Sequence, residues 1–215
     1  MAVTPKRRTR ERIVEVGLRL FNDFSEPNVT TSLIAAELGI SPGNLYYHFR
    51  NKEEIVTALF VAFEEEMASL LLESQRGRPA VEDVWLQIRG LFDLIWRYQF
   101  LYRDLNDILS RNRTVELQFK RILQLSVRAA MTACDALIAA GEMQASRIER
   151  DALADNIVVV ASYWMSYEYV RNPRERLSEI AGRRGAFQVL ALAGPYLRGR
   201  SRELFEKLAE KYLAD

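Results

Sequence analysis

The stretch over residues 30–52, TTSLIAAELGISPGNLYYHFRNK, constrains the fold of this chain more than any other segment. Its apolar residues Leu33, Ile34 and Leu38 fall on a period near 3.6, which predicts a short amphipathic helix over residues 31–38. Thr31 or Ser32, at the start of that helix, is suited to cap it. The residues that directly follow this helix indicate a sharp change of chain direction.

A turn and a second helix follow at once. Gly39 is typical of the residue that ends a helix, because glycine adopts a left-handed conformation without a Cβ clash. Ser41 and Pro42 then provide an N-cap and a first-turn proline, which predict a second helix over residues 42–48. Ile40 lies in the turn and is apolar enough to pack between the two helices. The segment is therefore a helix-turn-helix, whose second helix can enter the major groove of DNA.

The second helix has one buried and one exposed face. Leu45 and Phe49 are four residues apart, so they share a face that we expect to point inward. The opposite face is polar and aromatic, and suits hydrogen bonds to base edges or phosphates and apolar contacts with thymine methyl groups. It carries Asn44, Tyr46, Tyr47 and His48. For Tyr46 the alternative is packing against the first helix of the chain.

The run GISPGNLYYHFRNKEEI, residues 39–55, resembles the DNA-binding segment of TetR-type transcriptional regulators. The resemblance rests on its Leu-Tyr-Tyr-His-Phe core and on the Asn-Lys pair that opens the next helix, and it covers residues 8–60 in pattern. It implies a homodimeric, ligand-responsive repressor. It also places the base and phosphate contacts of the family on Thr31, Ser32, Asn44, Tyr46, Tyr47, His48 and Lys52. Ser32 departs from the family, in which an arginine that reads guanine is frequent at this place.

The start of the chain is basic. Residues 1–52 carry eight Lys or Arg against five Asp or Glu, although the whole chain of 215 residues has a net charge of only +1. Lys6, Arg7 and Arg8 lead this basic segment, which suits an arm that contacts phosphates or the minor groove. The alternative is a basic N-terminus that is merely solvated.

The whole sequence predicts an all-α fold. Residues 1–52 are expected to form a three-helix DNA-binding domain, joined by a long helix over 52–75 to a larger helical domain for ligand binding and dimerisation, residues 53–215. The other helices are expected over residues 6–24, 79–98, 101–110, 114–140, 148–171, 174–196 and 201–213. Alternating patterns typical of strands are absent from the sequence.

Aromatic residues are frequent in the second part of the chain and suggest a cavity for a flat or long apolar ligand. Trp85, Phe92 and Trp96 follow one another at spacings of seven and four, hence on one stripe of a helix. The candidate ligand-binding residues are Trp85, Arg89, Phe92, Trp96, Phe119, Tyr163, Trp164 and Tyr167. The alternative is that most of these side chains form an ordinary core.

An unbroken apolar run, residues 157–161, lies within the helix predicted over 148–171. A helix that is apolar all round must be covered on all sides, so one face can serve a partner subunit. Val158, Val159 and Met165, with Val189 of the following helix, are the candidate dimer contacts. A single-chain core explains the same run without a dimer.

The composition argues against an enzyme, a metal site or a cofactor site. The chain has one histidine, His48, which lies inside the second motif helix, and one cysteine, Cys134, which lies in an apolar helical run and is expected to be a buried thiol. No apolar stretch is expected to be long enough to span a membrane, so a cytoplasmic location is expected.

The function that these observations favour is a DNA-binding regulator, a repressor that binds a palindromic operator as a homodimer and is released by a small hydrophobic or amphipathic effector. The alternative is a ligand-independent nucleoid or division-linked DNA-binding protein.

Overall fold

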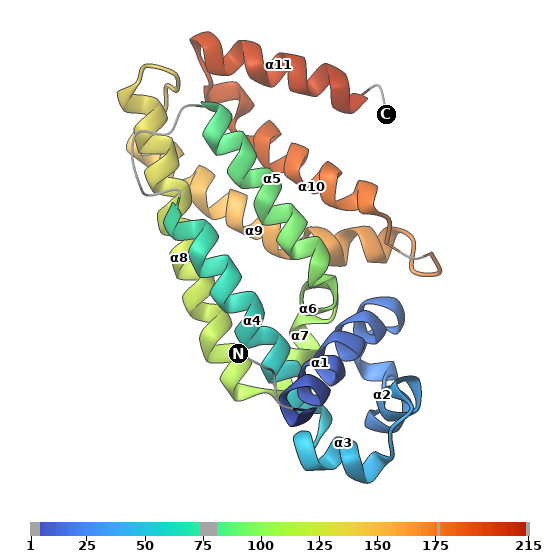
Figure 1. The fold of residues 1–215 in the computed structure, drawn as a ribbon. Coiled ribbons are helices and arrows are strands. Elements are labelled where there is room, and N and C mark those ends of the chain that lie inside the picture. The colour runs from blue at the N-terminus through green and yellow to red at the C-terminus, as the bar shows by residue number, and fades with distance from the viewer. Residues whose placement is uncertain (1–4, 74–80, 176, 214–215) are drawn as a thin grey trace. The chain divides into compact units, whose positions relative to one another are not determined.

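The computed structural model describes residues 5–73, 81–175 and 177–213, and within these ranges it contains helices and no strand. The expected all-α class is confirmed. The elements, labelled in Figure 1, are α1 (Pro5–Phe24), η1 (Glu26–Asn28), α2 (Thr31–Leu38), α3 (Pro42–His48), α4 (Lys52–Glu73), α5 (Val81–Arg97), α6 (Gln99–Arg103), α7 (Leu105–Arg111), α8 (Arg113–Ala139), α9 (Arg147–Arg171), α10 (Glu179–Ala193), η2 (Gly194–Tyr196) and α11 (Gly199–Leu213).

Two of the expected helices differ from the observed ones. The helix expected over residues 101–110 is two short helices, α6 and α7, which meet at Asp104. The Asp104 carboxylate accepts hydrogen bonds from its neighbour Arg103 and from the backbone N–H of Glu26, and the contact with Glu26 joins this junction to a segment distant in sequence. The helix expected from residue 174 begins only at Glu179, beyond the break that Pro173 imposes on α9.

The chain folds into two compact units. The first comprises Met1–Glu65 and Tyr98–Gln118, and the second comprises Glu66–Arg97 and Phe119–Asp215. Helices α4 and α8 each contribute residues to both units. This division differs from a single domain boundary at residue 52, because residues 98–118 belong with the N-terminal helices.

Aromatic rings dominate the core of the first unit. Phe63 of α4 is fully buried, and its ring centroid lies 5.5 Å from that of Tyr98 and 5.7 Å from that of Tyr102. Phe21 of α1 packs against Phe100 of α6 with their centroids 5.2 Å apart. Burial raises the pKa of the Tyr102 hydroxyl far above its usual range. Helix α6 is thus part of the same core as α1 and α4.

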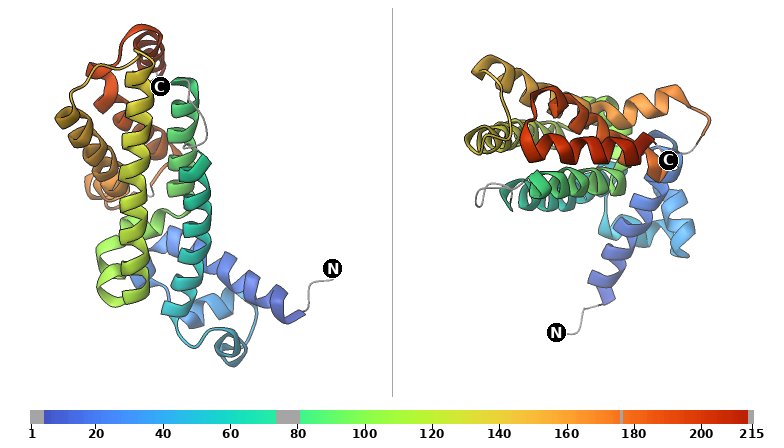
Figure 2. Two further views of the ribbon diagram at one scale, coloured as in Figure 1. Left: turned by 90° about the vertical axis from the view of Figure 1, so that its left-hand side faces the viewer. Right: turned by 90° about the horizontal axis from the view of Figure 1, so that it is seen from above.

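In the second unit, α10 packs against both α9 and α5. These helices are labelled in Figure 1, and Figure 2 shows the same ribbon from two further directions. The close approach depends on Gly185 of α10, because a Cβ atom there would lie 2.5 Å from Cδ1 of Trp164 and closer still to the Phe92 ring. The indole N–H of Trp164 donates a hydrogen bond of 2.6 Å to the carbonyl oxygen of Ala181. A large aromatic pair thereby fills the contact between three helices.

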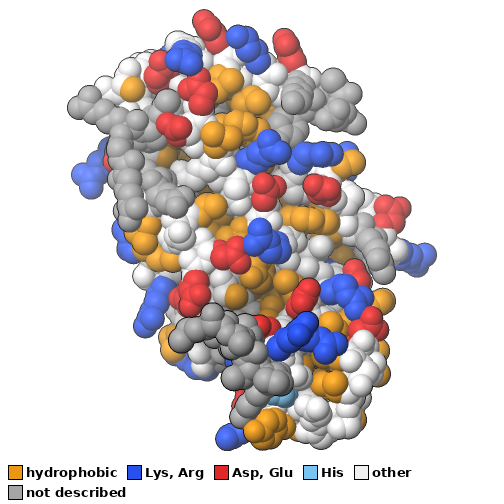
Figure 3. All heavy atoms as spheres, in the orientation of Figure 1, with side chains coloured by type: hydrophobic (Ala, Val, Ile, Leu, Met, Phe, Trp, Pro, Cys, Tyr) orange, Lys and Arg blue, Asp and Glu red, His pale blue; other side chains and the backbone are white. Residues whose placement is uncertain are grey.

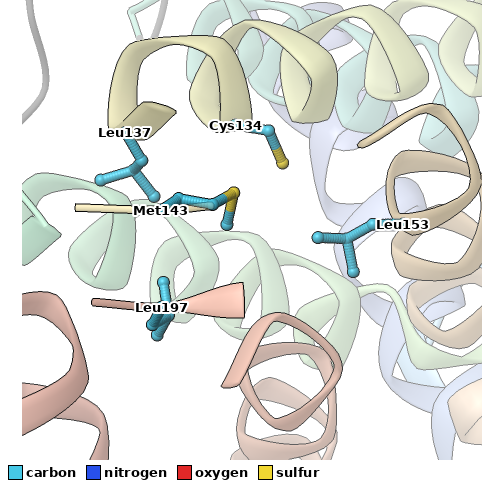
Figure 4. Packing of buried hydrophobic residues seen from close by; sticks show 5 residues of the cluster. All are labelled: Cys134, Leu137, Met143, Leu153 and Leu197. Carbon is cyan, nitrogen blue, oxygen red and sulfur yellow. The ribbon is translucent and has the colours of Figure 1, made fainter. Parts of the chain in front are cut away.

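A smaller apolar cluster surrounds the single cysteine (Figure 4). Cys134 lies with Leu137, Met143, Leu153 and Leu197, all buried, at the C-terminal end of α8. Burial, with a smaller contribution from the neighbouring Asp135 charge, raises the pKa of the Cys134 thiol to about 11. The expectation of a buried, unreactive thiol agrees with this environment.

One helix bears on the expectation about membrane spans. Within the described residues, α8 is long and apolar enough to cross a membrane by length and composition alone. Helices of water-soluble bundles pass the same test, so this single helix is weak evidence for a membrane span.

Candidate nucleic-acid interface

Local hydrogen bonds define the helix-turn-helix. Helix α2 is capped by Thr30, whose hydroxyl accepts a hydrogen bond of 3.1 Å from the backbone N–H of Leu33. The cap is thus one residue earlier than the sequence suggested. Gly39 ends α2 in the left-handed conformation, with φ of 66°, as expected. Ser41 caps α3 by accepting a hydrogen bond of 3.2 Å from the N–H of Asn44.

Helix α3 presents the faces that its sequence predicts. Leu45 and Phe49 are buried, whereas Asn44, Tyr46 and Tyr47 are exposed. Tyr47 is 67% exposed and Tyr46 is 47% exposed. An exposed aromatic side chain of this size on a short helix has no role in the core, which favours contact with a partner.

Further contacts orient the exposed face of α3. The hydroxyl groups of Tyr46 and Thr31 lie 3.2 Å apart and share a hydrogen bond, which joins α3 to α2. The rings of Tyr47 and His48 meet edge to face, with their centroids 5.3 Å apart. Ser32 is exposed on α2. Tyr46 therefore leans on α2 through its hydroxyl group while nearly half of its surface stays accessible.

The basic N-terminal segment is helical from Pro5, so it forms the first turns of α1 rather than a separate extended arm. Arg8 is exposed, and the guanidinium of Arg10 lies over the Phe49 ring, 4.7 Å from its centroid. The side chains of Lys6 and Arg7 lie outside the part of the chain that the structure describes.

Lys52 is engaged within the protein. Its ammonium group lies 3.0 Å from Oε1 of Glu26 and donates a hydrogen bond of 2.8 Å to the carbonyl oxygen of the same residue. Sequence reasoning missed this pair, because Glu26 stands in a turn that the helical periodicity does not describe. The one sequence clue to the Glu26–Lys52 pair is that an acidic residue stands shortly before the helix-turn-helix.

The candidate ligand-binding residues fall into distinct environments. Phe92 and Trp164 meet at Gly185 of α10, and the Cβ atom of Trp96 lies near Gly182 of the same helix. Trp85 is half-buried, Phe119 is buried and Arg89 is exposed. Tyr163 and Tyr167 are exposed on α9, and the ring centroid of Tyr167 lies 5.4 Å from that of Trp164, at the edge of this group.

The candidate dimer residues also differ in their exposure. Val158, Met165 and Val189 are buried within the single chain, so the structure corrects their assignment to a dimer interface. Val159 is 57% exposed. The physical reason is the helical period: neighbouring residues in an unbroken apolar run point to different faces, and only one of those faces is covered.

Among the residues that the structure describes, no group of three or more His, Cys, Asp or Glu side chains could hold a metal ion. On the face shown in Figure 3, charged side chains of both signs alternate with small hydrophobic patches. The helix-turn-helix is the arrangement here that carries a recognisable function.

Comparisons with known proteins agree with this geometry. The chain is similar to a TetR-family transcriptional regulator from Marinobacter aquaeolei, with 34% identity, a TM-score of 0.85, and coverage of 95% of this chain and 98% of that one. It is 30% identical over 96 residues to the class C tetracycline repressor protein of Escherichia coli, and 33% identical over 95 residues to the nucleoid occlusion factor SlmA of a Shewanella strain. These alignments cover 44% and 43% of this chain, and 41% and 48% of the two curated relatives.

Two family models match consecutive parts of the chain. The model described as bacterial regulatory proteins of the tetR family matches residues 13–59, which contain the helix-turn-helix. The model described as a bacterial transcriptional repressor matches residues 62–205. Regulators of this family are DNA-binding proteins and not enzymes. The chain therefore belongs to the TetR family of bacterial transcriptional regulators.

Proposed function

We propose that this protein is a cytoplasmic, homodimeric repressor that binds a palindromic operator and is released by a small hydrophobic or amphipathic effector. The observation that carries the proposal is the exposed face of α3, on which Asn44, Tyr46 and Tyr47 stand over buried Leu45 and Phe49. Two copies of such a helix in a two-fold dimer read two half-sites separated by about one helical turn or a multiple of it.

An apolar stripe on α9 supports the proposed dimer. Val159, Tyr163, Tyr167 and Val170 follow one another at spacings of four, four and three, so they share one face of the helix. All four are exposed in the single chain, from 48% for Tyr163 to 73% for Val170. A second copy of the chain, related by two-fold symmetry, is the occupant that this self-complementary stripe fits.

Replacing Tyr163 with Glu should convert the dimer to a monomer at micromolar concentration, because the new carboxylate would lose its hydration inside an apolar interface. Light scattering coupled to size-exclusion chromatography measures the mass directly. Leu86→Glu is the matched control, since Leu86 is also exposed but lies on α5, away from the stripe. A Tyr163→Glu variant that keeps the wild-type mass would place the dimer interface elsewhere.

The proposed effector is apolar because the second unit is rich in aromatic side chains that are only partly buried. Trp85, Trp96 and Trp164 all retain some accessible surface. Such side chains provide large apolar contact areas. Structures that share the fold include a gamma-butyrolactone receptor and a ketosteroid transcriptional regulator of Mycobacterium tuberculosis, and their names point to a lactone and a ketosteroid.

The proposed function can be tested although the operator sequence is unknown. Wild-type protein should enrich a duplex with an inverted repeat from a randomised DNA pool, and the same repeat should be protected in a footprint on the region upstream of its own gene. A panel of lactones, steroids and long-chain acyl compounds should then contain a member that releases this duplex. Enrichment of sequences without two-fold symmetry would contradict the proposed mode of binding.

A second candidate function is ligand-independent DNA binding linked to the nucleoid or to division. The similarity to nucleoid occlusion factor SlmA favours it. The two functions differ in the response to effectors: a repressor releases its duplex when an apolar compound binds, whereas the second candidate keeps it throughout the panel.

Replacing Tyr47 with Ala should weaken binding of the enriched duplex by about 1 to 3 kcal/mol, or roughly 5- to 150-fold. The stability of the protein should change by less than about 0.5 kcal/mol, because the side chain is 67% exposed. Fluorescence anisotropy and thermal melting measure the two effects. Leu117→Ala removes another exposed side chain, from α8, and should leave DNA affinity unchanged. Equal affinities of the Tyr47→Ala variant and the wild type would remove Tyr47 from the interface.

A further inference from the structure

A buried carboxylate lies directly ahead of the helix-turn-helix. Glu26 of η1 is 1% exposed, and each of its two oxygen atoms is paired with a cation. Oε1 lies 3.0 Å from Nζ of Lys52, the first residue of α4, and Oε2 lies 2.6 Å from Nη2 of Arg111, the last residue of α7. A buried charge persists only with such partners, so the three side chains form one unit.

The backbone of Glu26 is held by the same elements. Its N–H donates a hydrogen bond of 2.8 Å to Oδ2 of Asp104, at the junction of α6 and α7, and its carbonyl oxygen accepts one of 2.8 Å from Lys52. The preceding residue, Ser25, has φ of 69°, which residues other than glycine rarely adopt. The contacts of Glu26 therefore hold a strained turn in place.

The partners of Glu26 are themselves fixed. Arg111 also lies 2.6 Å from Asp107 and 3.7 Å from Glu53, and its hydrogen bonds to Asp107 and Glu26 raise its pKa, so it remains charged. Arg103 of α6 donates hydrogen bonds of 2.6 and 2.9 Å to the carbonyl oxygens of Phe21 and Asn22, near the end of α1. The turn between α1 and α2 is thus tied to α4, α6 and α7.

We propose that Glu26 is a positioning residue for DNA binding, and that Lys52 acts through Glu26 rather than by contact with a DNA phosphate. The carboxylate clamps the turn before α2 to the start of α4, which follows α3, and to the end of α7. It thereby fixes the helix-turn-helix at both of its ends. Lys52 has an 18% exposed side chain and two oxygen partners inside the protein, so its charge is already balanced.

A test of this inference compares the salt dependence of DNA binding. It rests on the DNA-binding function proposed above and uses the duplex enriched by the wild-type protein. A lysine that contacts phosphate contributes about 0.9 to the slope of log K against log salt. Lys52→Met should weaken binding at least tenfold while the slope stays that of the wild type. A slope shallower by about 0.9 would overturn the proposal and make Lys52 a phosphate contact.

A double-mutant cycle provides an independent readout. Glu26→Gln keeps the shape of the side chain and removes its charge, and it should weaken DNA binding by at least tenfold. If Lys52 acts through Glu26, adding Lys52→Met to the Glu26→Gln variant should lower its DNA affinity by less than a further twofold. Fully additive effects would contradict the proposal. Lys52→Arg, which can still pair with Glu26, should restore most of the affinity.

Controls separate the possible failures. Circular dichroism and stoichiometric titration give the folded, active fraction of each variant, and affinities refer to that fraction. If Glu26→Gln does not fold, the salt slopes of Lys52→Met and Lys52→Arg still decide between positioning and phosphate contact. Failure of the wild-type protein to enrich any duplex would instead count against the proposed DNA-binding function and not against the positioning role of Glu26.

Discussion

Replacing Phe63 with Ala should lower the free energy of unfolding by about 3 to 5 kcal/mol, the range typical for truncation of a buried phenylalanine. Phe63 is fully buried, and its ring lies 5.5 to 5.7 Å from those of Phe60, Tyr98 and Tyr102. These rings cannot close around an alanine without leaving their own contacts, so most of the cavity should remain.

Urea titration followed by circular dichroism measures the loss. Val61→Ala is the matched control, because Val61 lies two residues away on the same helix and is 39% exposed. The Val61→Ala substitution should change the free energy of unfolding by less than about 0.5 kcal/mol. A loss below about 1 kcal/mol for Phe63→Ala, well under the usual range, would mean that α4 and α6 do not share the core described above.

Gly185→Ala should destabilise the protein by about 3 kcal/mol, although alanine is the better helix former. The added methyl group would lie 2.5 Å from Cδ1 of Trp164 and closer still to the buried Phe92 ring. Neither ring is the free end of a flexible side chain, so α10 must move away from α5 and α9. That movement would also strain the hydrogen bond from Trp164 to Ala181.

Gly43→Ala is the informative comparison for this prediction. Gly43 lies in α3, and a Cβ atom there would meet nothing within 4 Å. The same substitution should therefore stabilise the protein by about 0.5 to 1 kcal/mol through helix propensity alone. Thermal melting of the two variants should give shifts of opposite sign. A Gly185→Ala variant that melts at or above the wild-type temperature would mean that the contact at Gly185 is not as tight as described.

The helices and the exposed face of α3 could be predicted because their signals are local. Gly39, Ser41 and Pro42 specify the turn by their own conformational preferences, and the structure has the elements that they predict. The spacing of Leu45 and Phe49 was enough to orient α3. Local chemistry of this kind does not depend on the rest of the chain.

The Glu26 network could not be predicted in the same way. Glu26 and Arg111 are 85 residues apart, and no periodicity relates a turn residue to the end of a distant helix. The buried and exposed faces of the apolar run in α9 could not be predicted for another reason. Because residues 157–161 are all apolar, the sequence does not indicate which face is covered, and only the fold shows that Val158 points inward and Val159 outward.

The single thiol has a practical consequence for measuring motion in this protein. Cys134 is buried and its pKa is about 11, so less than about 0.1% of it is thiolate at neutral pH. Maleimide reagents will therefore favour any cysteine introduced on the surface, without removal of the native one. In the dimer proposed above, a spin label attached in this way to each copy of α3 would report the spacing of the two helices with and without the proposed effector.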